Sequence, residues 1–432
     1  MLRFAWTDLN AEERGSALAR PIDIADDALM ARVRDILADV KARGDAALAD
    51  YTARFDTDAS VQLSVPQEAL EAAWNALDAS DQAVIERARR NVKTFHTAQM
   101  PADIEVETEP GVVCRREVRA IDTAGLYIPG GTAPLVSTVI MLATPAKVAG
   151  VRRRVVVTPP GKNGQIDPVI LACAYRCNVT DVFAVGGAQA IAALAYGTET
   201  IPRCDKIFGP GNAYVAAAKS MVSSAPGGPA IDMPAGPSEA MVICDETADP
   251  AFIASDLLSQ AEHDRVAQVI CVSCCPHVSE AVEVELDKQL QALSRKDIAA
   301  DALSHARMIV TDERADIVDI VNRYAPEHLI VQMDRPELLV PAIRNAGSIF
   351  LGPWTPESVG DYASGTNHTL PTNGAARAYS GITIESFLKF VSVQRLTKAG
   401  LKRLGPVVER LAEMEGLDAH RNAVTLRLES MQ

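Results

Sequence analysis

The chain has 432 residues, of which 48% are hydrophobic and only 5% aromatic. This length predicts two to three domains with sizeable cores, which excludes disorder for the bulk of the chain. Acidic residues outnumber basic ones by 56 to 42, giving a formal net charge of -14, and no basic block interleaved with aromatic residues occurs. Binding to nucleic acids or to anionic membranes is therefore not expected.

The first ten residues, MLRFAWTDLN, turn polar after six positions and lack the apolar core and the cleavage site of a signal peptide. The most apolar stretch, from Ala133 to Val148, is interrupted by Pro134, Pro145 and Lys147, so it is too short to span a membrane. We expect a soluble, cytoplasmic protein.

Helical spacing of apolar residues dominates from about residue 26 to residue 100, and Pro66 stands where the first turn of a helix is expected. From Val112 onward, short β-branched runs alternate with Gly/Pro turns and helical patterns, which is typical of βαβ units. The Gly/Pro-rich passage SSAPGGPAIDMPAGPSE separates this block from a second block of similar rhythm. The pattern is helical again from about Ser380.

These patterns predict an α/β fold with two incomplete Rossmann-like, parallel-sheet domains, a helical N-terminal segment and a small helical C-terminal tail. Residues 1–108 and 239–380 are predicted to form a first α/β domain. Residues 109–238 are predicted to form the second Rossmann-like domain, and residues 381–432 a C-terminal helical segment.

The eight cysteines are too few and too irregularly spaced for a disulfide framework in so long a chain. Cys271, Cys274 and Cys275 have a spacing that zinc or redox sites also use, but they fall in a pattern typical of a buried strand. Cys173 and Cys177 lie one helical turn apart. We interpret both groups as reduced thiols of the core.

Neither GxGxxG after a strand nor GxxxxGK[ST] occurs, so the usual phosphate-binding loops are missing. Glycine turns nevertheless follow three predicted strands, at residues 127–131, 185–189 and 208–212. Ligands of open α/β sheets bind at the carboxyl ends of strands, where Tyr127, Gln189 and Asn212 would supply side-chain contacts. The alternative is that these are ordinary strand-to-helix turns.

Four of the seven histidines stand close to carboxylates or amides, namely His263 in QAEHD, His328 in APEHL, His368 in GDYASGTNH and His420 in EGLDAH. Gln260 and His263 are three residues apart, so one helix face could present both to a metal ion. His96, His277 and His305 lack such neighbours and are interpreted as surface residues.

Imidazoles, a carboxylate and an amide oxygen suit a borderline divalent ion such as zinc. Spacing alone does not select which of these groups converge, and each histidine could equally be a satisfied structural residue. Glu327 and His328 open an apolar strand, where an adjacent acid and base suit proton transfer. Gly416 is expected to end one helix and Asp418 to cap the next, with Glu415 and His420 on either side.

Long strings of the chain resemble the histidinol dehydrogenase family in the same order along nearly the whole length. They include GLYIPGGTAPLVSTVIMLATPAKVAG, DKIFGPGNAYV, IDMPAGPSEAMV, SDLLSQAEHD, YAPEHL, GDYASGTNHTLPT and EGLDAH. The resemblance implies oxidation of L-histidinol through L-histidinal to L-histidine with two NAD molecules and one zinc ion per subunit. It also implies a homodimer in which the C-terminal segment completes the partner's site.

The resemblance assigns roles position by position. It implies zinc ligation by Gln260, His263, Asp361 and His420, and catalysis by Glu327 and His328. Substrate contacts are implied for Ser238, His368 and Glu415, together with the zinc ligands and His328. NAD contacts are implied for Tyr127, Gln189 and Asn212, which the glycine turns also indicate.

Three alternatives stay open from the sequence. A relative could oxidise another small polar alcohol, although Ser238, His368 and Glu415 favour histidinol. A zinc hydrolase could use Glu327 to activate water, which would leave the glycine turns unused. A non-catalytic binding protein would keep the site without turnover.

Overall fold

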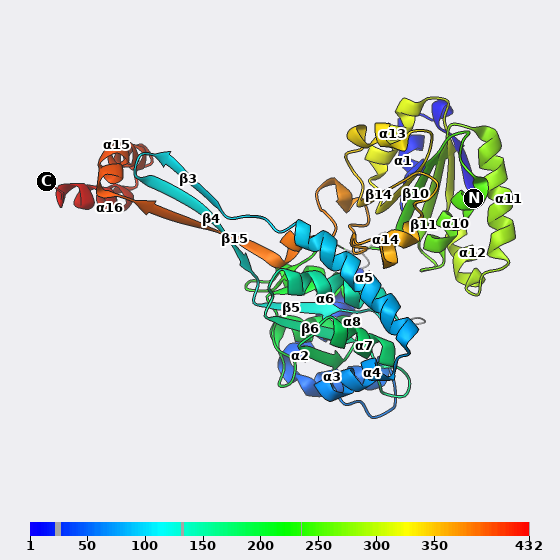
Figure 1. The fold of residues 1–432 in the computed structure, drawn as a ribbon, viewed down its shortest axis with the longest axis horizontal. Coiled ribbons are helices and arrows are strands. Elements are labelled where there is room, and N and C mark those ends of the chain that lie inside the picture. The colour runs from blue at the N-terminus through cyan, green and yellow to red at the C-terminus, as the bar shows by residue number, and fades with distance from the viewer. Residues whose placement is uncertain (22–26, 131–133, 235, 432) are drawn as a thin grey trace. The chain divides into compact units, whose positions relative to one another are not determined.

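The computed structural model describes residues 1–21, 27–130, 134–234 and 236–431. Two compact units make up the chain. The core unit comprises residues 1–99 and 122–387, and the tail unit comprises residues 100–121 and 388–432. Figure 1 shows both units and labels many of their elements.

The first sheet of the core unit is parallel throughout. Its strand order is β1 (Leu2–Ala5), β12 (Arg307–Val310), β11 (Gln268–Ser273), β10 (Glu239–Cys244), β13 (His328–Gln332) and β14 (Ser348–Leu351). Helices cover both faces, which explains why β10, β11 and β13 are buried along their whole length.

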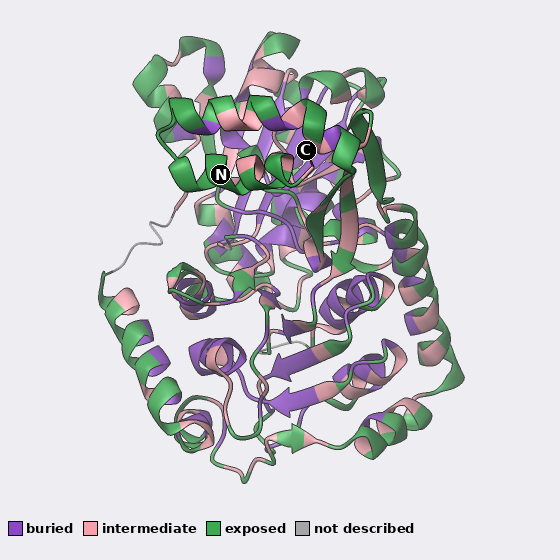
Figure 2. Cartoon of the chain, turned by 90° about the vertical axis from the view of Figure 1, so that its left-hand side faces the viewer, coloured by how far each residue is buried: buried purple, intermediate pink, exposed green. Residues whose placement is uncertain are grey.

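The second sheet has the order β2 (Ser64–Val65), β7 (Asp181–Ala184), β6 (Arg153–Thr158), β5 (Thr123–Tyr127), β8 (Lys206–Phe208) and β9 (Ala230–Ile231). Its strands are parallel except β2, which pairs antiparallel with β7. The strand order reverses direction between β5 and β8. Crevices at such switch points are where open α/β sheets bind ligands. The central strands β5, β6, β7 and β8 are mostly buried, whereas the edge strands β2 and β9 are not. Figure 2 shows that the outer faces of the surrounding helices are exposed.

Helices pack around both sheets (Figure 1). Around the first sheet lie α1 (Ala11–Ala17), α10 (Pro250–Ala261), α11 (Pro276–Leu290), α12 (Lys296–Ser304), α13 (Arg314–Tyr324) and α14 (Glu357–Tyr362). Around the second lie α2 (Asp27–Arg43), α3 (Asp45–Phe55), α4 (Gln67–Ala76), α5 (Ala79–Ala98), α6 (Val136–Val148), α7 (Pro168–Arg176), α8 (Gly187–Tyr196) and α9 (Ala213–Ser224). Short 3-10 turns span Trp6–Asp8, Pro336–Leu338, Val340–Ala342, Ala375–Arg377 and Ile384–Phe387.

The helical entry segment packs differently from the predicted domain division. The strand β1 and helix α1 do join the first sheet, as the grouping of residues 1–108 with 239–380 requires. Helices α2, α4 and α5, however, pack against α8, α7 and α6 around the second sheet. Helical periodicity reveals that a helix has an apolar face, but it does not reveal which sheet that face will cover.

The tail unit is built on an antiparallel sheet with the order β15 (Leu388–Leu396), β4 (Val112–Ala120) and β3 (Ile104–Glu109). Two helices follow, α15 (Lys398–Met414) and α16 (Asp418–Glu429). The predicted helical tail matches these two helices but misses β15, because its partner strand lies more than 250 residues earlier in the chain.

The remaining expectations concern histidine, cysteine and membrane segments. His96 is fully buried on α5 instead of lying at the surface, and its Nδ1 lies 2.8 Å from the Val92 carbonyl oxygen. Cys173, Cys177 and Cys271 are buried free thiols, as predicted. Among the described residues, no helix combines the length and the apolar character that a bilayer crossing demands.

The switch point depends on a glycine that follows β8. Gly209 has φ +118, and a Cβ on it would lie 2.1 Å from the carbonyl oxygen of Tyr127. Gly227 also has positive φ, at +70, but no heavy atom lies within 4 Å of the Cβ position. We expect Gly227→Ala to cost about 1 kcal/mol of unfolding free energy from backbone strain alone. Gly209→Ala should cost about 2–5 kcal/mol, since the neighbouring backbone must also shift.

Urea unfolding of both variants measures this difference. Equal losses for the two variants would contradict the close approach of β5 and the Gly209 turn.

Candidate functional site

The predicted catalytic pair lies at the amino end of the first sheet. His328 is the first residue of β13, and Ala240, the second residue of β10, is its partner in the neighbouring strand. Glu327 directly precedes the strand, after Ala325 ends α13 in the left-handed conformation. Because both strands are buried on both faces, the side chains of Glu327 and His328 are buried as well.

His328 is held through its Nδ1 atom. That atom lies 3.1 Å from the carbonyl oxygen of Glu239 and 2.9 Å from Nε2 of Gln260. A proton on Nδ1, donated to the Glu239 carbonyl, leaves the lone pair on Nε2. Within the described residues Nε2 makes no hydrogen bond, and it lies 3.5 Å from Oδ1 of Asp361. The ring therefore presents a buried, unsatisfied nitrogen to the site.

Buried carboxylates surround this imidazole. The ligand atoms of His328, Glu357 and Asp361 all lie within 4.8 Å of one another. Burial raises the pKa of Glu327 to about 8 and that of Glu357 to about 7, while the positive charge of His328 opposes both shifts. Burial lowers the pKa of His328, but the neighbouring carboxylates outweigh it and raise the pKa to about 10. Such crowding of buried negative charge favours a cation.

Glu357 was missed by the sequence analysis. It lies on α14 one turn before Asp361, so the two carboxylates project from one face of that short helix. The spacing of Glu and Asp in PESVGDY was the signal that could have identified Glu357. The burial of its side chain, which is 1% exposed, could not be read from the sequence.

Of the other predicted residues, His263 and His368 lie close enough to Asp361 to affect its pKa, whereas Gln260 contacts His328. Gln260 is buried at the end of α10, and exposed His263 follows two residues beyond that helix. Burial would raise the pKa of Asp361, but His328, His368 and His263 lower it below its usual value. His368 is held beside Asp361, because its Nδ1 lies 2.9 Å from the main-chain oxygen of that residue.

His368 also connects the two halves of the core unit. Its Nε2 lies 3.3 Å from Oγ1 of Thr138 on α6, which packs around the second sheet. The neighbouring Asn367 donates to the Met141 carbonyl of the same helix at 2.6 Å. Ser238 precedes β10 and is half-buried, and its carbonyl accepts a hydrogen bond from the Gln268 main chain at 3.0 Å.

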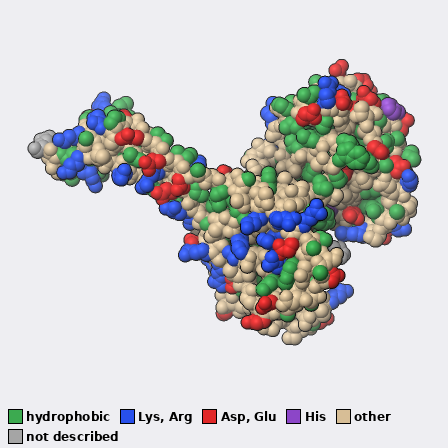
Figure 3. All heavy atoms as spheres, viewed as in Figure 1, with side chains coloured by type: hydrophobic (Ala, Val, Ile, Leu, Met, Phe, Trp, Pro, Cys, Tyr) green, Lys and Arg blue, Asp and Glu red, His purple; other side chains and the backbone are tan. Residues whose placement is uncertain are grey.

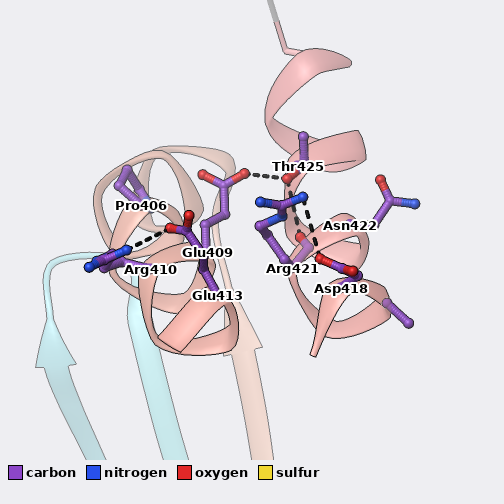
Figure 4. A pocket seen from close by; sticks show the side chains of 9 residues that line it. Pro406, Glu409, Arg410, Glu413, Asp418, Arg421, Asn422 and Thr425 are labelled. Carbon is purple, nitrogen blue, oxygen red and sulfur yellow. Dashed lines mark hydrogen bonds and ion pairs between the residues drawn. The ribbon is translucent and has the colours of Figure 1, made fainter. Parts of the chain in front are cut away.

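Glu415 and His420 belong to the tail unit, so the core unit by itself brings together only part of the predicted residue set. Both are exposed and flank Gly416, whose φ of +69 ends α15 as predicted. Leu417 occupies the N-cap of α16, and Asp418 is its first helical residue instead of the cap. A cavity of about 720 Å³ opens between α15 and α16 (Figure 4).

Charged side chains that line this tail cavity already pair with one another. Arg410 donates to Glu413 at 2.8 Å, and Thr425 donates to Glu409 (Figure 4). Neither Glu415 nor His420 is among the lining residues. The cavity therefore adds no ligand to the predicted metal set.

The predicted NAD contacts line one cavity of about 1130 Å³ at the carboxyl ends of the second sheet. Tyr127 ends β5, and its hydroxyl accepts a hydrogen bond from the Gly187 amide at 3.1 Å. Gln189 lies in the first turn of α8, whose N-terminus has no side-chain cap. Asn212 caps α9 through Oδ1, which accepts from Tyr214 and Val215. An uncapped helix N-terminus favours an anionic group such as a pyrophosphate.

A buried ion pair fixes the turn that carries Asn212. Nζ of Lys219 lies 2.5 Å from Oδ1 of Asp232, and both side chains are almost fully buried. Lys219 also donates to the Gly209 carbonyl at 2.8 Å, and the Gly209 amide donates to Asp232 at 2.8 Å. Each polar group of Gly209 is therefore held by one member of the pair.

The cysteine spacing noted in the sequence brings Cys274 and Cys275 close to Glu246, with ligand atoms within 4.8 Å. Burial raises the pKa of Cys274 to about 11 and raises that of Cys275 as well. Both residues follow β11, which ends at Ser273, and are only partly buried, so the interpretation as core thiols does not hold for them.

Comparison with known proteins identifies the family. The family model described as histidinol dehydrogenase matches residues 20–428. A histidinol dehydrogenase of Vibrio cholerae is 50% identical over 432 residues, covering 100% of this chain and 99% of the relative. One of Vibrio parahaemolyticus is 49% identical over 431 residues, with coverage of 100% and 99%. The crystal structure of histidinol dehydrogenase from Elizabethkingia anophelis is 44% identical, with a TM-score of 0.94 and coverage of 100% and 98%.

A family model that spans nearly the whole sequence and relatives of about half identity agree with the buried acid–base pair and the carboxyl-end cavity. The chain belongs to the histidinol dehydrogenase family, whose members are NAD-dependent oxidoreductases that act on histidinol in the last steps of histidine biosynthesis.

Proposed function

We propose that this chain oxidises L-histidinol to L-histidine at the amino end of the first sheet, with Glu327 and His328 as the proton-transfer residues. The observation that carries this proposal is the buried imidazole of His328, whose Nε2 is unsatisfied among the described residues and lies beside Asp361. A general base needs a lone pair beside the atom that loses its proton. A cation bound at this cluster would offset the carboxylates that raise the pKa of His328 and would leave Nε2 free to accept a proton.

Zinc is the metal that we propose for the site, with one ion per subunit held by Gln260, His263, Asp361 and His420. The donor set of two imidazoles, a carboxylate and an amide oxygen fits zinc. Of that set, Asp361 belongs to the cluster with His328 and Glu357, whose negative charge favours a cation. When bound, the ion would supply a positive charge that orients the amino and imidazole nitrogens of histidinol. Ser238, His368 and Glu415 would complete the substrate contacts.

The first oxidation requires a base. His328 accepts the hydroxyl proton of histidinol, while hydride leaves the carbinol carbon for the nicotinamide ring of NAD. This step yields histidinal, NADH and one proton. Tyr127, Gln189 and Asn212 would hold the NAD in the cavity that they line.

The second oxidation requires water. Glu327 removes a proton from a water molecule that adds to the aldehyde carbon, and protonated His328 gives its proton to the carbonyl oxygen, which forms the hydrate and restores neutral His328. A carboxylate with its pKa raised to about 8 is a base of suitable strength near neutral pH. His328 then accepts a hydroxyl proton as a second hydride passes to a second NAD, which gives histidine. Four electrons leave the substrate, and two NAD molecules receive them.

We further propose a cytoplasmic homodimer in which the tail unit completes the partner's site. The tail unit carries many exposed apolar side chains, which is unusual for a surface that stays in water. They are Ile104, Val106, Phe390, Val391, Leu396, Val407, Leu411, Met414, Leu417 and Leu426. Figure 3 shows apolar and charged side chains together on the visible face of this unit. A second copy would cover the apolar side chains and would receive Glu415 and His420.

The reaction is tested by the yield of NADH from a limiting amount of L-histidinol. We expect two NADH per histidinol, loss of turnover after chelation, and recovery with zinc. Turnover of an ester or amide substrate without NAD would instead support a zinc hydrolase. If a purified, zinc-loaded protein formed no NADH, the result would support a non-catalytic binding role. Faster oxidation of another alcohol than of histidinol would identify that alcohol as the substrate.

The division of labour between the two residues predicts different defects. Glu327→Gln keeps an oxygen that can accept from the Glu239 amide, so the chain should still fold and still oxidise histidinol to the aldehyde. Its conversion of added histidinal should fall by about 10²–10⁴-fold, since no carboxylate activates the water. His328→Asn should slow both steps by a similar factor.

Single-turnover NADH formation from histidinol and from histidinal separates the two steps. The exposed His277→Asn provides a matched control with unchanged rates. Equal loss of both steps in Glu327→Gln would exclude a water-specific role.

Complementation between subunits tests the shared site. His420→Ala and His328→Asn subunits should each be nearly inactive in their own homodimers. If the tail completes the partner's site, a co-expressed heterodimer contains one fully wild-type site and one doubly altered site. A random mixture should therefore recover about a quarter of wild-type activity, because half the dimers are mixed and half their sites are intact. No recovery would show that His420 acts in its own subunit.

A further inference from the structure

We propose that Arg20 and Glu239 form a positioning clamp for the catalytic residues Glu327 and His328. The inference rests on the proposed function, in which these two residues transfer protons. It concerns two residues that hold Glu327 and His328 in place and do not transfer protons themselves. We call the Arg20–Glu239 pair the strand-end clamp.

The main chain of Glu239 contacts both catalytic side chains. Its amide donates to Oε2 of Glu327 at 2.8 Å, and its carbonyl oxygen lies 3.1 Å from Nδ1 of His328. The amide favours the ionised form of Glu327, and the carbonyl selects the tautomer of His328 that carries its proton on Nδ1. A displacement of this single residue would therefore misplace the acid and the base together.

The side chain of Glu239 anchors that main chain. Arg20 grips the carboxylate with two nitrogens, Nε at 2.5 Å and Nη2 at 2.8 Å. The Asn373 amide adds a third hydrogen bond at 2.9 Å. The carboxylate side chain is only 3% exposed, so these bonds act in a medium where water does not compete.

Arg20 is itself held from the end of α13. Its guanidinium lies over the ring of Tyr324 at 4.0 Å and donates to the Tyr324 carbonyl at 3.0 Å. Tyr324 is the last residue of α13 and precedes Glu327 by three positions. The clamp therefore joins the start of β10 to the segment that carries Glu327 and His328, although Arg20 lies more than 200 residues earlier in the chain.

The geometry assigns Arg20 to positioning and not to catalysis. Its guanidinium donors are directed to the Glu239 carboxylate and to the Tyr324 carbonyl. The positive charge of Arg20 also balances a carboxylate that would otherwise add to the buried negative charge around His328. Loss of the clamp should lower kcat, while the cavity lined by Gln189, which the clamp does not contact, should keep its affinity for NAD.

The test compares Arg20→Ala with Arg43→Ala in the zinc-loaded enzyme. Arg43 also forms a two-pronged pair, with Asp39 at 2.7 Å, but on the exposed surface of α2. We expect Arg20→Ala to lose at least about tenfold in kcat, and up to about 100-fold, with the KM for NAD changed less than about twofold. Millimolar guanidinium ion should restore part of this loss, and Arg20→Lys should retain an intermediate kcat. Arg43→Ala should match the wild type.

Amide hydrogen exchange gives a readout that does not depend on turnover. Peptides covering residues 237–243 and 325–330 should exchange faster in Arg20→Ala than in the wild type. In Arg43→Ala their exchange rates should equal those of the wild type. If Arg20→Ala does not fold, Glu239→Gln replaces it and should show the same kcat loss and exchange pattern. Wild-type protein without NADH formation would refute the proposed function alone. The clamp proposal would be wrong if the folded variant showed unchanged exchange. It would also be wrong if the kcat of that variant were within twofold of the kcat of an active wild type.

Discussion

Negative charge is buried around His328, and this constraint governs the design of the core unit. Glu327, Glu357 and Asp361 surround one imidazole in a region that water scarcely reaches. Carboxylates in such a place either take up protons or require positive partners. The raised pKa values of Glu327 and Glu357 show the first response, and the ion pair of Asp361 with His328 shows the second. A bound divalent cation would satisfy the same requirement.

The two sheets of the core unit place their sites at opposite strand ends. The second sheet uses the carboxyl ends at its switch point, where glycine turns and an uncapped helix N-terminus suit a dinucleotide. The first sheet uses the amino ends of β10 and β13, where a catalytic pair can be fixed by buried main-chain groups. His368 connects the two through Thr138, so the proposed cofactor and substrate regions share one framework.

Buried ion pairs hold the main chain in both halves. Lys219 and Asp232 fix Gly209 beside the cavity, while Arg20 and Glu239 fix the start of β10. In each case a largely buried charged pair holds a short stretch of main chain that would otherwise be free to shift. Such pairs contribute little net stability, but they select one geometry. A site that transfers hydride and protons depends on that geometry.

Local patterns in the sequence predicted the alternation of strands and helices, the glycine turns beside Tyr127, Gln189 and Asn212, and the strand opened by Glu327 and His328. These features depend on neighbours within a few residues, so spacing and turn chemistry suffice. Tertiary structure alone decided that α2, α4 and α5 cover the second sheet, that β15 pairs with β4, and that His96 is buried. It also brought Glu357 and the Arg20–Glu239 pair to the site. Those outcomes depend on contacts between residues far apart in the chain. A periodic pattern indicates that a face is apolar or charged, but it does not indicate which other element will pack against that face.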